Sequence, residues 1–129
     1  MARIHVAAGI LRNVAGEVLI TERLCDGPFN GLWEFPGGKI GNGESPAAAL
    51  RRELREELGI EVTILEPFMS LSHEYPDRLV ELQFFLVTDW DGEPEGLEGQ
   101  GLRWVNIAAL NADELLPADA PLVNALQTS

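Results

Sequence analysis

The sequence predicts one domain that mixes α and β structure, and three observations lead to this expectation. Its 129 residues are the usual length of a single domain. Short apolar runs bounded by glycine, proline and asparagine are typical of strands, and they occur in both halves of the chain. One central segment instead repeats leucine every four residues, as an amphipathic helix does.

In the first part of the chain, apolar runs at 4–10 and 17–23 predict two strands. Turn residues at 13–16 separate them, so we expect a hairpin. The segment 25–31 is rich in glycine, proline and asparagine and is therefore expected to be a loop.

A glycine-rich segment follows at 36–43, after a short apolar run at 33–35. It holds four glycines in eight residues, which is too many for the interior of a strand or helix. Glycines let the backbone approach a ligand closely, and Lys39, with Arg23 upstream, is a candidate phosphate-binding residue. The alternative, a plain turn, stays open on these residues alone.

The central helix has recognisable ends. Ser45 is a suitable N-cap, Pro46 suits the first helical position, and Gly59 suits the C-terminal cap. These signals predict a helix of about 13 residues. Its apolar stripe consists of Leu50, Leu54 and Leu58, with Ala47 on the same side.

The second half of the chain is expected to be mostly strands. Runs at 60–72 and 79–89 predict two strands separated by a turn at Pro76 and Asp77. The remaining elements are an acidic glycine-rich loop at 92–101, a short strand at 102–105 and a final short helix at 120–126.

Composition excludes several classes of protein. The net charge is -12, from 21 acidic and 9 basic side chains, so we expect no binding to duplex nucleic acid and a metal ion wherever phosphate binds. No apolar run approaches the roughly 18 residues of a membrane span. Cys25 is the only cysteine, which excludes an internal disulfide and a cysteine-based zinc site. With no signal-peptide pattern, we expect a cytoplasmic protein, and a monomer.

Three carboxylates gather on the central helix. Glu53, Glu56 and Glu57 are related as i, i+3 and i+4 and therefore share one side. A solvated face braced by neighbouring arginines is the ordinary explanation. However, the acids crowd the last two turns, where the helix dipole favours cations, and like charges at this spacing repel. A divalent cation would relieve both effects, and hard carboxylate ligands suit Mg²⁺ or Mn²⁺, which prefer to share a phosphate with the protein.

The region from Gly38 to Ile60 carries a motif with fixed spacing: Gly38, Glu44, Arg52-Glu53-Leu54, Glu56-Glu57 and Gly59-Ile60. These residues fill every fixed position of the signature of the Nudix hydrolase family, which the chain therefore resembles. Further segments resemble the MutT-type members of the family, which are 8-oxo-dGTP diphosphatases. These segments are 10–13, 34–40, 75–78, 90–94, 98–100 and 110–113.

The resemblance implies the Nudix α/β/α sandwich, with a mixed central sheet between helices. It also implies a Mg²⁺-dependent enzyme, with Mn²⁺ as a possible substitute, that converts a nucleoside triphosphate to the monophosphate and pyrophosphate. Oxidised purine nucleotides such as 8-oxo-dGTP are the implied substrates. The alternatives are a hydrolase of CTP, 5-methyl-dCTP or another nucleoside-diphosphate compound, and a binding module without activity. The three intact glutamates argue against a binding module.

The resemblance also implies a role for each site residue. Glu53 would be the general base, with Glu98 as its rival, while Arg52 would hold the helix carboxylates and Glu44 would brace the loop. The metal ligands would be Glu53, Glu56, Glu57, Glu98 and the carbonyl of Gly37. The substrate-binding residues would be Arg23, Phe35, Gly38, Lys39, Arg78 and Asp119.

Asp119 departs from the MutT-type pattern, which has asparagine at this position. An asparagine side chain both donates and accepts, whereas an ionised aspartate only accepts. Asp119 can therefore bind the N–H donors of 8-oxoguanine or the amine of cytosine. A third reading makes Asp119 the N-cap of the final helix.

Overall fold

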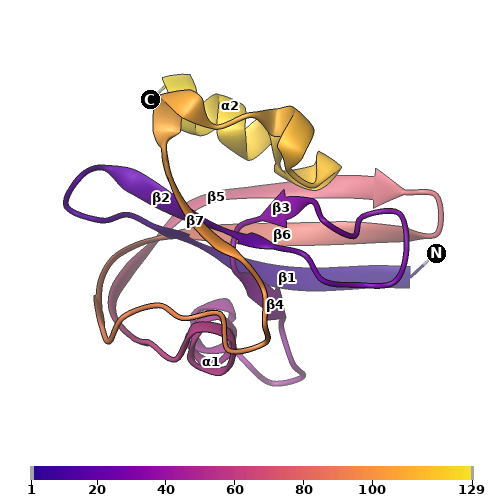
Figure 1. The fold of residues 1–129 in the computed structure, drawn as a ribbon. Helices are drawn as coiled ribbons and strands as arrows, with labels where there is room; N and C mark the ends of the chain where they lie inside the picture. The colour runs from indigo at the N-terminus through magenta and orange to yellow at the C-terminus, as the bar shows by residue number, and fades with distance from the viewer. Residues whose placement is uncertain (1, 129) are drawn as a thin grey trace.

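The computed structural model describes residues 2–128, which form two β-sheets and two α-helices (Figure 1). The first sheet has the strand order β4-β1-β6-β5 and is mixed, because β1 runs parallel to β6 while the other pairs are antiparallel. The second, antiparallel sheet has the order β3-β2-β7. The strands are β1 (Ala2–Leu11), β2 (Glu17–Glu22), β3 (Trp33–Glu34), β4 (Gly37–Lys39), β5 (Glu61–Tyr75), β6 (Arg78–Asp91) and β7 (Leu102–Asn106).

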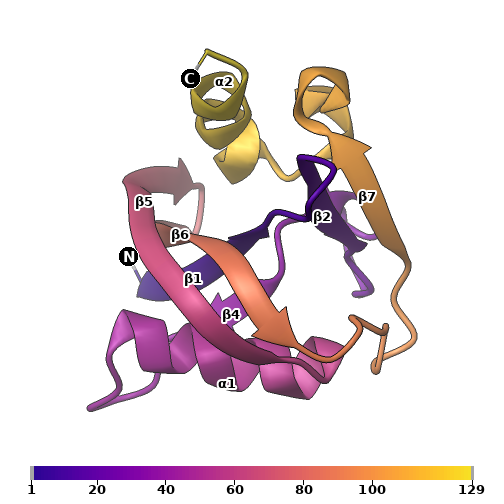
Figure 2. The same cartoon turned by 90° about the vertical axis from the view of Figure 1, so that its left-hand side faces the viewer.

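The two helices lie on opposite sides of the sheets, as Figure 2 shows. They are α1 (Pro46–Leu58) and α2 (Ala120–Thr128). Three short 3₁₀ turns, which sequence patterns did not indicate, lead from β7 to α2: η1 (Ile107–Ala109), η2 (Ala112–Glu114) and η3 (Pro117–Asp119). The expected sandwich with a mixed sheet between helices is therefore present, and the second sheet is an addition to it. No helix within residues 2–128 is long and apolar enough to cross a membrane.

The predicted hairpin between the first two strands is wrong. β1 and β2 belong to different sheets, and the bridge between Arg12 and Val18 lies just after the end of β1. One edge of β1 pairs with β6 along its whole length, and β2 pairs with β7 from Glu17 to Thr21, so each strand has another partner. The turn itself forms as expected, since the Asn13 side chain accepts the N–H groups of Ala15 and Glu17.

The glycine-rich segment is only partly a loop. Its first residues form β4, so the expectation that so many glycines exclude a strand is wrong. The glycines are needed here because the strand runs very close to β1: a Cβ atom on Gly37 would lie 2.1 Å from the carbonyl oxygen of Ala7.

The predicted central helix is confirmed with its caps. The Ser45 side chain accepts from the N–H of Ala48 at 3.1 Å, and Gly59 has a left-handed φ of 71°. The two long strands, the last short strand and the final helix are also confirmed, each extending beyond its expected range at one or both ends.

The core consists of two clusters, one on each face of the mixed sheet. On one face, Ala7 and Leu11 of β1 pack with Leu50, Leu54 and Leu58 of α1. The opposite face packs against η3 and α2, with Ala8, Ile10, Phe84, Ala118 and Leu122 among its members. Burial of the leucine stripe leaves the glutamates of α1 beside β4, at the edge of the core.

Candidate active site

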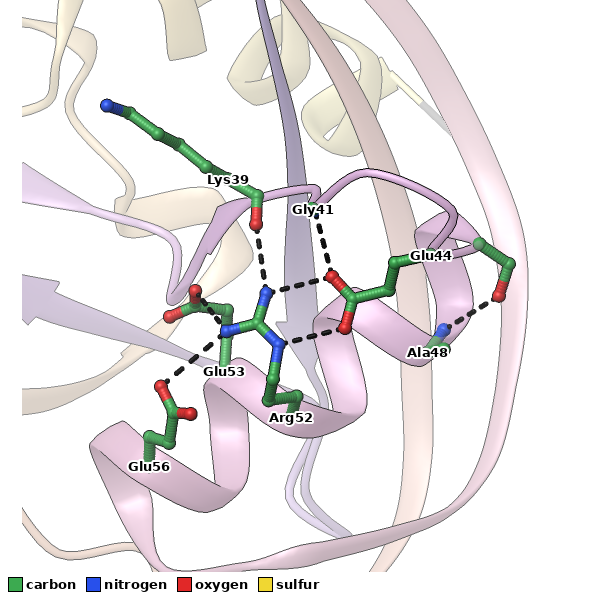
Figure 3. Close-up of polar contacts among 8 residues, drawn as sticks. Lys39, Gly41, Glu44, Ala48, Arg52, Glu53 and Glu56 are labelled. Carbon is green, nitrogen blue, oxygen red and sulfur yellow. Dashed lines mark hydrogen bonds and ion pairs between the residues drawn. The ribbon is translucent and has the colours of Figure 1, made fainter.

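Arg52 is the centre of the polar contacts on α1 (Figure 3). Its Nε and Nη2 donate to the two carboxylate oxygens of Glu44, at 2.8 and 2.9 Å, and Nη2 also donates to the carbonyl of Lys39 at 3.1 Å. Its Nη1 donates to Glu53 at 2.9 Å and lies 3.6 Å from Glu56. Because a guanidinium is planar and rigid, these contacts fix the Glu53 side chain relative to the loop before the helix.

Glu44 ties the same loop to the helix. Hydrogen bonds from Arg52 and from the N–H of Gly41 lower the pKa of Glu44 to about 2. Glu44 is therefore ionised at any pH near neutrality, and its attraction for Arg52 persists there.

Glu57 is the glutamate of α1 whose ionisation is most disfavoured by its surroundings. Burial, followed by the charges of Glu53, Glu98 and Glu34, raises the pKa of Glu57 to about 8. A hydrogen bond from the N–H of Gly37 opposes this rise without cancelling it. Three carboxylates from three parts of the chain thus oppose ionisation of Glu57, which is the situation that a bound cation relieves.

The donor set fits a hard divalent cation. It consists of carboxylate oxygens and of the backbone of β4, which are the ligand types that Mg²⁺ and Mn²⁺ prefer. Within residues 2–128, no three acidic, histidine or cysteine side chains are already arranged as a metal site. The carboxylates of Glu53 and Glu56 instead both face Nη1 of Arg52, at 2.9 and 3.6 Å.

Gly38 allows β4 to pass directly beside Glu53. A Cβ atom at this position would lie 2.4 Å from the carboxylate carbon of Glu53, closer than any side chain can approach. The second glycine of β4 therefore leaves the space that the carboxylate occupies.

Two pockets adjoin the glutamates. The first, which we call the acidic pocket, has a volume of about 420 Å³ and is lined by residues that include Arg23, Glu34, Glu57, Glu98 and Gln100. The second, the apolar pocket, has a volume of about 260 Å³. Its lining includes Ile4, Val6, Phe35, Tyr75, Arg78 and Asp119. Both pockets share Arg23 and Glu34, so the ion pair between these two residues is their common wall.

Two arginines in the pocket walls have unused donors. The Nε atoms of Arg23 and Arg78 are buried and have no hydrogen-bond partner within residues 2–128. Arg78 lies over the ring of Tyr75, with its guanidinium carbon 5.3 Å from the ring centre. Since an unpaired buried donor is costly, these two groups are suited to bind the oxygens of a ligand.

Asp119 is a buried wall residue of the apolar pocket, with 3% of its surface exposed. Burial, followed by the charge of Glu34, raises the pKa of Asp119 to about 7. The N–H of Phe35 and the charge of Arg23 oppose the rise. The carboxylate thus faces the pocket as a candidate base-reading group.

The side chains of two predicted site residues, Lys39 and Glu56, lie at the periphery of the glutamate cluster. Lys39 contributes its carbonyl to Arg52, while its side chain is exposed and extends away from the glutamates (Figure 3). Glu56 is largely exposed and touches the cluster only through Arg52.

Sequence reasoning missed Glu34, Gln100 and Tyr75 as pocket residues. Glu34 offered one signal, because an acidic residue between two aromatic ones in a short strand must point away from them. Gln100 and Tyr75 offered none, because their contacts with Glu57 and Phe29 join parts of the chain that are distant in sequence.

The chain was compared with known proteins. The model of the family described as "NUDIX domain" matches residues 2–126. The chain is 44% identical to an 8-oxo-dGTP diphosphatase of Escherichia coli, with 98% of each chain covered. It is 46% identical to an 8-oxo-dGTP diphosphatase of Haemophilus influenzae, over 95% of this chain and 90% of the relative.

Two further similarities bear on the site. A CTP pyrophosphohydrolase of Escherichia coli is 40% identical, over 97% of this chain and 92% of the relative. Among solved structures, one from a study of MutT of Aliivibrio salmonicida and Vibrio cholerae superposes with a TM-score of 0.84 at 41% identity, over 98% of both chains.

Proposed function

The chain belongs to the Nudix hydrolase family, and we propose that it converts oxidised purine nucleoside triphosphates, such as 8-oxo-dGTP, to the monophosphate and pyrophosphate. One observation carries the proposal: the acidic pocket, suited to metal and phosphate, opens beside an apolar pocket that ends in Asp119. Removal of such nucleotides from the precursor pool of DNA replication, and hence mutation avoidance, is the role that we assign to this activity. We propose that the enzyme acts in the cytoplasm. We also propose that it is a monomer, since a single chain supplies the lining of both pockets.

Nudix hydrolases depend on a divalent metal ion, and for this chain we propose Mg²⁺, with Mn²⁺ as a substitute. Glu53, Glu56, Glu57, Glu98 and the carbonyl of Gly37 would hold it. When bound, the ion neutralises phosphate charge and makes a nearby water more acidic.

The chain's own residues perform the remaining steps. Glu53, oriented by Arg52, takes a proton from the attacking water, and Glu98 is the rival base. The water oxygen bonds to the β-phosphorus, and the bond from that phosphorus to the oxygen shared with the α-phosphate breaks. The nucleoside monophosphate leaves, and the water oxygen remains in pyrophosphate. Arg23 donates to the phosphates as they span the two pockets.

The apolar pocket holds the nucleoside. Phe35 and Arg78 contact it, and Asp119 accepts from the N–H donors of the base. 8-Oxoguanine offers both ring and amino N–H groups. Cytosine offers one amine, and the similarity to a CTP pyrophosphohydrolase makes CTP or 5-methyl-dCTP hydrolysis the second candidate.

A substrate panel tests the proposal. With Mg²⁺ present, kcat/KM is measured for 8-oxo-dGTP, dGTP, CTP, 5-methyl-dCTP and an ADP-sugar, and we expect the highest value for 8-oxo-dGTP. A higher value for a cytidine nucleotide would establish the second candidate. Excess chelator should abolish hydrolysis and added Mg²⁺ should restore it. In ¹⁸O-labelled water the label should appear in pyrophosphate, and label confined to the monophosphate would contradict attack at the β-phosphorus.

A further inference from the structure

The acidic loop 92–101 closes the carboxyl end of α1. The last carbonyls of a helix have no partner inside it. Here the N–H of Leu97 donates to the carbonyl of Glu57 and the N–H of Glu95 donates to the carbonyl of Leu58, each at 3.1 Å. The loop that carries Glu98 is thus docked on the turn that carries Glu57.

Gln100 adds a second link between the same two places. Its Oε1 accepts from the N–H of Glu98 at 2.9 Å, and its Nε2 donates to the carbonyl of Glu57 at 3.2 Å. One side-chain amide therefore bridges the backbones of both residues. The side-chain amides of asparagine and glutamine carry a donor and an acceptor in one planar group, and glutamine has the longer reach.

The rest of the loop packs closely against Gln100. A Cβ atom on Gly96 would lie 2.2 Å from the carbonyl oxygen of Gln100 and 3.3 Å from its Oε1, and Gly99 has a left-handed φ of 82°. At the end of the loop, the N–H of Gly101 donates to the side chain of Glu22 at 3.3 Å, which anchors the loop to β2. Between these anchors, the Gln100 side chain holds the N–H of Glu98.

A restraint on the position of Glu98 is needed because Glu57 and Glu98 are both acidic, and the charge of Glu98 disfavours ionisation of Glu57. Repulsion between like charges favours loop positions in which Glu98 lies farther from the helix. We propose that Gln100 is a positioning residue that keeps Glu98 beside Glu57 before any ligand binds. The consequence for catalysis rests on the proposed function, in which both glutamates hold the metal.

The first test uses metal-free protein and needs no catalysis. In Gln100→Ala, hydrogen exchange at the Glu98 amide, followed by NMR, should be at least about tenfold faster than in the wild type, because that amide loses its acceptor. Mn²⁺ alone, titrated by electron paramagnetic resonance, should bind about tenfold more weakly, as is usual when a residue supporting a metal ligand is removed. Gln100→Glu keeps an acceptor but loses the donor, so it should still protect the Glu98 amide.

Gln127 provides the matched control. Its side-chain amide also bonds to the backbone, donating from Nε2 to the carbonyls of Ile107 and Leu110 at 3.1 and 3.0 Å, and Gln127 does not line the acidic pocket. Gln127→Ala should leave the Glu98 amide, Mn²⁺ binding and kcat unchanged.

The activity test is a double-mutant cycle. Gln100→Ala should lower kcat about tenfold in the wild type but have no further effect when combined with Glu98→Ala, because it acts through Glu98. The proposal would be overturned if hydrogen exchange at the Glu98 amide were unchanged in Gln100→Ala. It would also be overturned if adding Gln100→Ala to Glu98→Ala lowered kcat by a further factor of about ten. If the wild type hydrolyses no nucleotide, the proposed function fails, while exchange and Mn²⁺ binding still decide the role of Gln100.

Discussion

Arg23 Nη1 donates to Glu34 Oε2 over 2.9 Å, and this ion pair is the wall that the acidic and apolar pockets share. Arg23 directly follows β2, and Glu34 lies in β3, so the pairing of these strands brings the two side chains together. Glu34 also adds its negative charge to the surroundings of both Glu57 and Asp119. One residue therefore influences both the proposed metal ligand Glu57 and the proposed base-reading residue Asp119.

Glu34→Ala should raise KM for the nucleoside triphosphate about tenfold with a smaller effect on kcat, because Arg23 loses the charge-assisted hydrogen bond that orients it. Glu34→Gln, whose amide oxygen still accepts from Arg23, should recover most of the loss. Steady-state kinetics of both variants measures this. The matched control is Glu61→Ala, which removes the exposed ion pair with Arg55 and should leave KM unchanged. Equal KM values for Glu34→Ala and Glu61→Ala would show that Glu34 does not orient Arg23.

Glu53→Gln should reduce kcat by about a hundredfold or more, because an amide cannot take a proton from water. The amide can still accept from Arg52, so thermal denaturation should show a fold that remains intact. Glu66→Gln, on the exposed part of β5, is the control for loss of one charge. A kcat within a factor of about three of the wild type would remove Glu53 as the base and leave Glu98 in that role.

Gly38→Ala should move the Glu53 carboxylate. The added Cβ atom would lie 2.4 Å from the carboxylate carbon, so the side chain must shift by about 1 Å, which is enough to lower kcat about tenfold to a hundredfold. Gly41→Ala is the comparison, since its Cβ atom would lie 3.2 Å from Oε1 of Glu44, which is a much smaller conflict. Similar kcat values for the two variants would mean that Glu53 has room to retreat without loss of function.

Arg52→Lys should lower kcat about tenfold even though the charge is kept, because an ammonium cannot reproduce the forked contacts with Glu44 and Glu53. The melting temperature of the protein should also fall, because the loop before α1 is held less firmly. Arg51→Lys, at the exposed neighbouring position, is the control. If Arg51→Lys and Arg52→Lys behave alike, the fork of Arg52 is dispensable.

The parts of the fold that could be predicted are those encoded locally. Ser45, Pro46 and Gly59 sit next to the helix ends that they determine, so α1 was predicted at its observed bounds. The turn at Asn13 was likewise foreseen, but the partner of β1 was not. That partner is β6, from the other half of the chain, and no local pattern specifies such a pairing.

The residues of the candidate site likewise fall into those that local sequence spacing could predict and those that depend on contacts between distant parts of the chain. Helical spacing alone placed Glu53, Glu56 and Glu57 on one side. The approach of Asp119 to Phe35 joins distant parts of the chain, and Asp119 was a candidate only through resemblance to a family. Glu34 and Gln100 were missed because their importance comes from what they meet in three dimensions.

Asp119 should make the stability of the protein depend on pH. Its ordinary pKa is 3.8 and burial raises it to about 7 in the folded chain, so the folded state binds more protons than the unfolded state between these values. The free energy of unfolding should therefore fall as pH rises through this window, by at most about 1.4 kcal/mol per pH unit from this group.

Asp119→Asn removes the titrating group and can still accept from the N–H of Phe35. The stability of this variant relative to the wild type should therefore increase steadily between pH 5 and pH 7, measured by urea denaturation with chelator present. The carboxylates that do not interact with Asp119 are common to both proteins, so their titration cancels in the difference. Asp113→Asn, at the exposed surface, controls for the loss of one charge. A difference that stays constant over this range would show that Asp119 is already ionised in the folded protein at pH 5, and that it meets the base as an acceptor only.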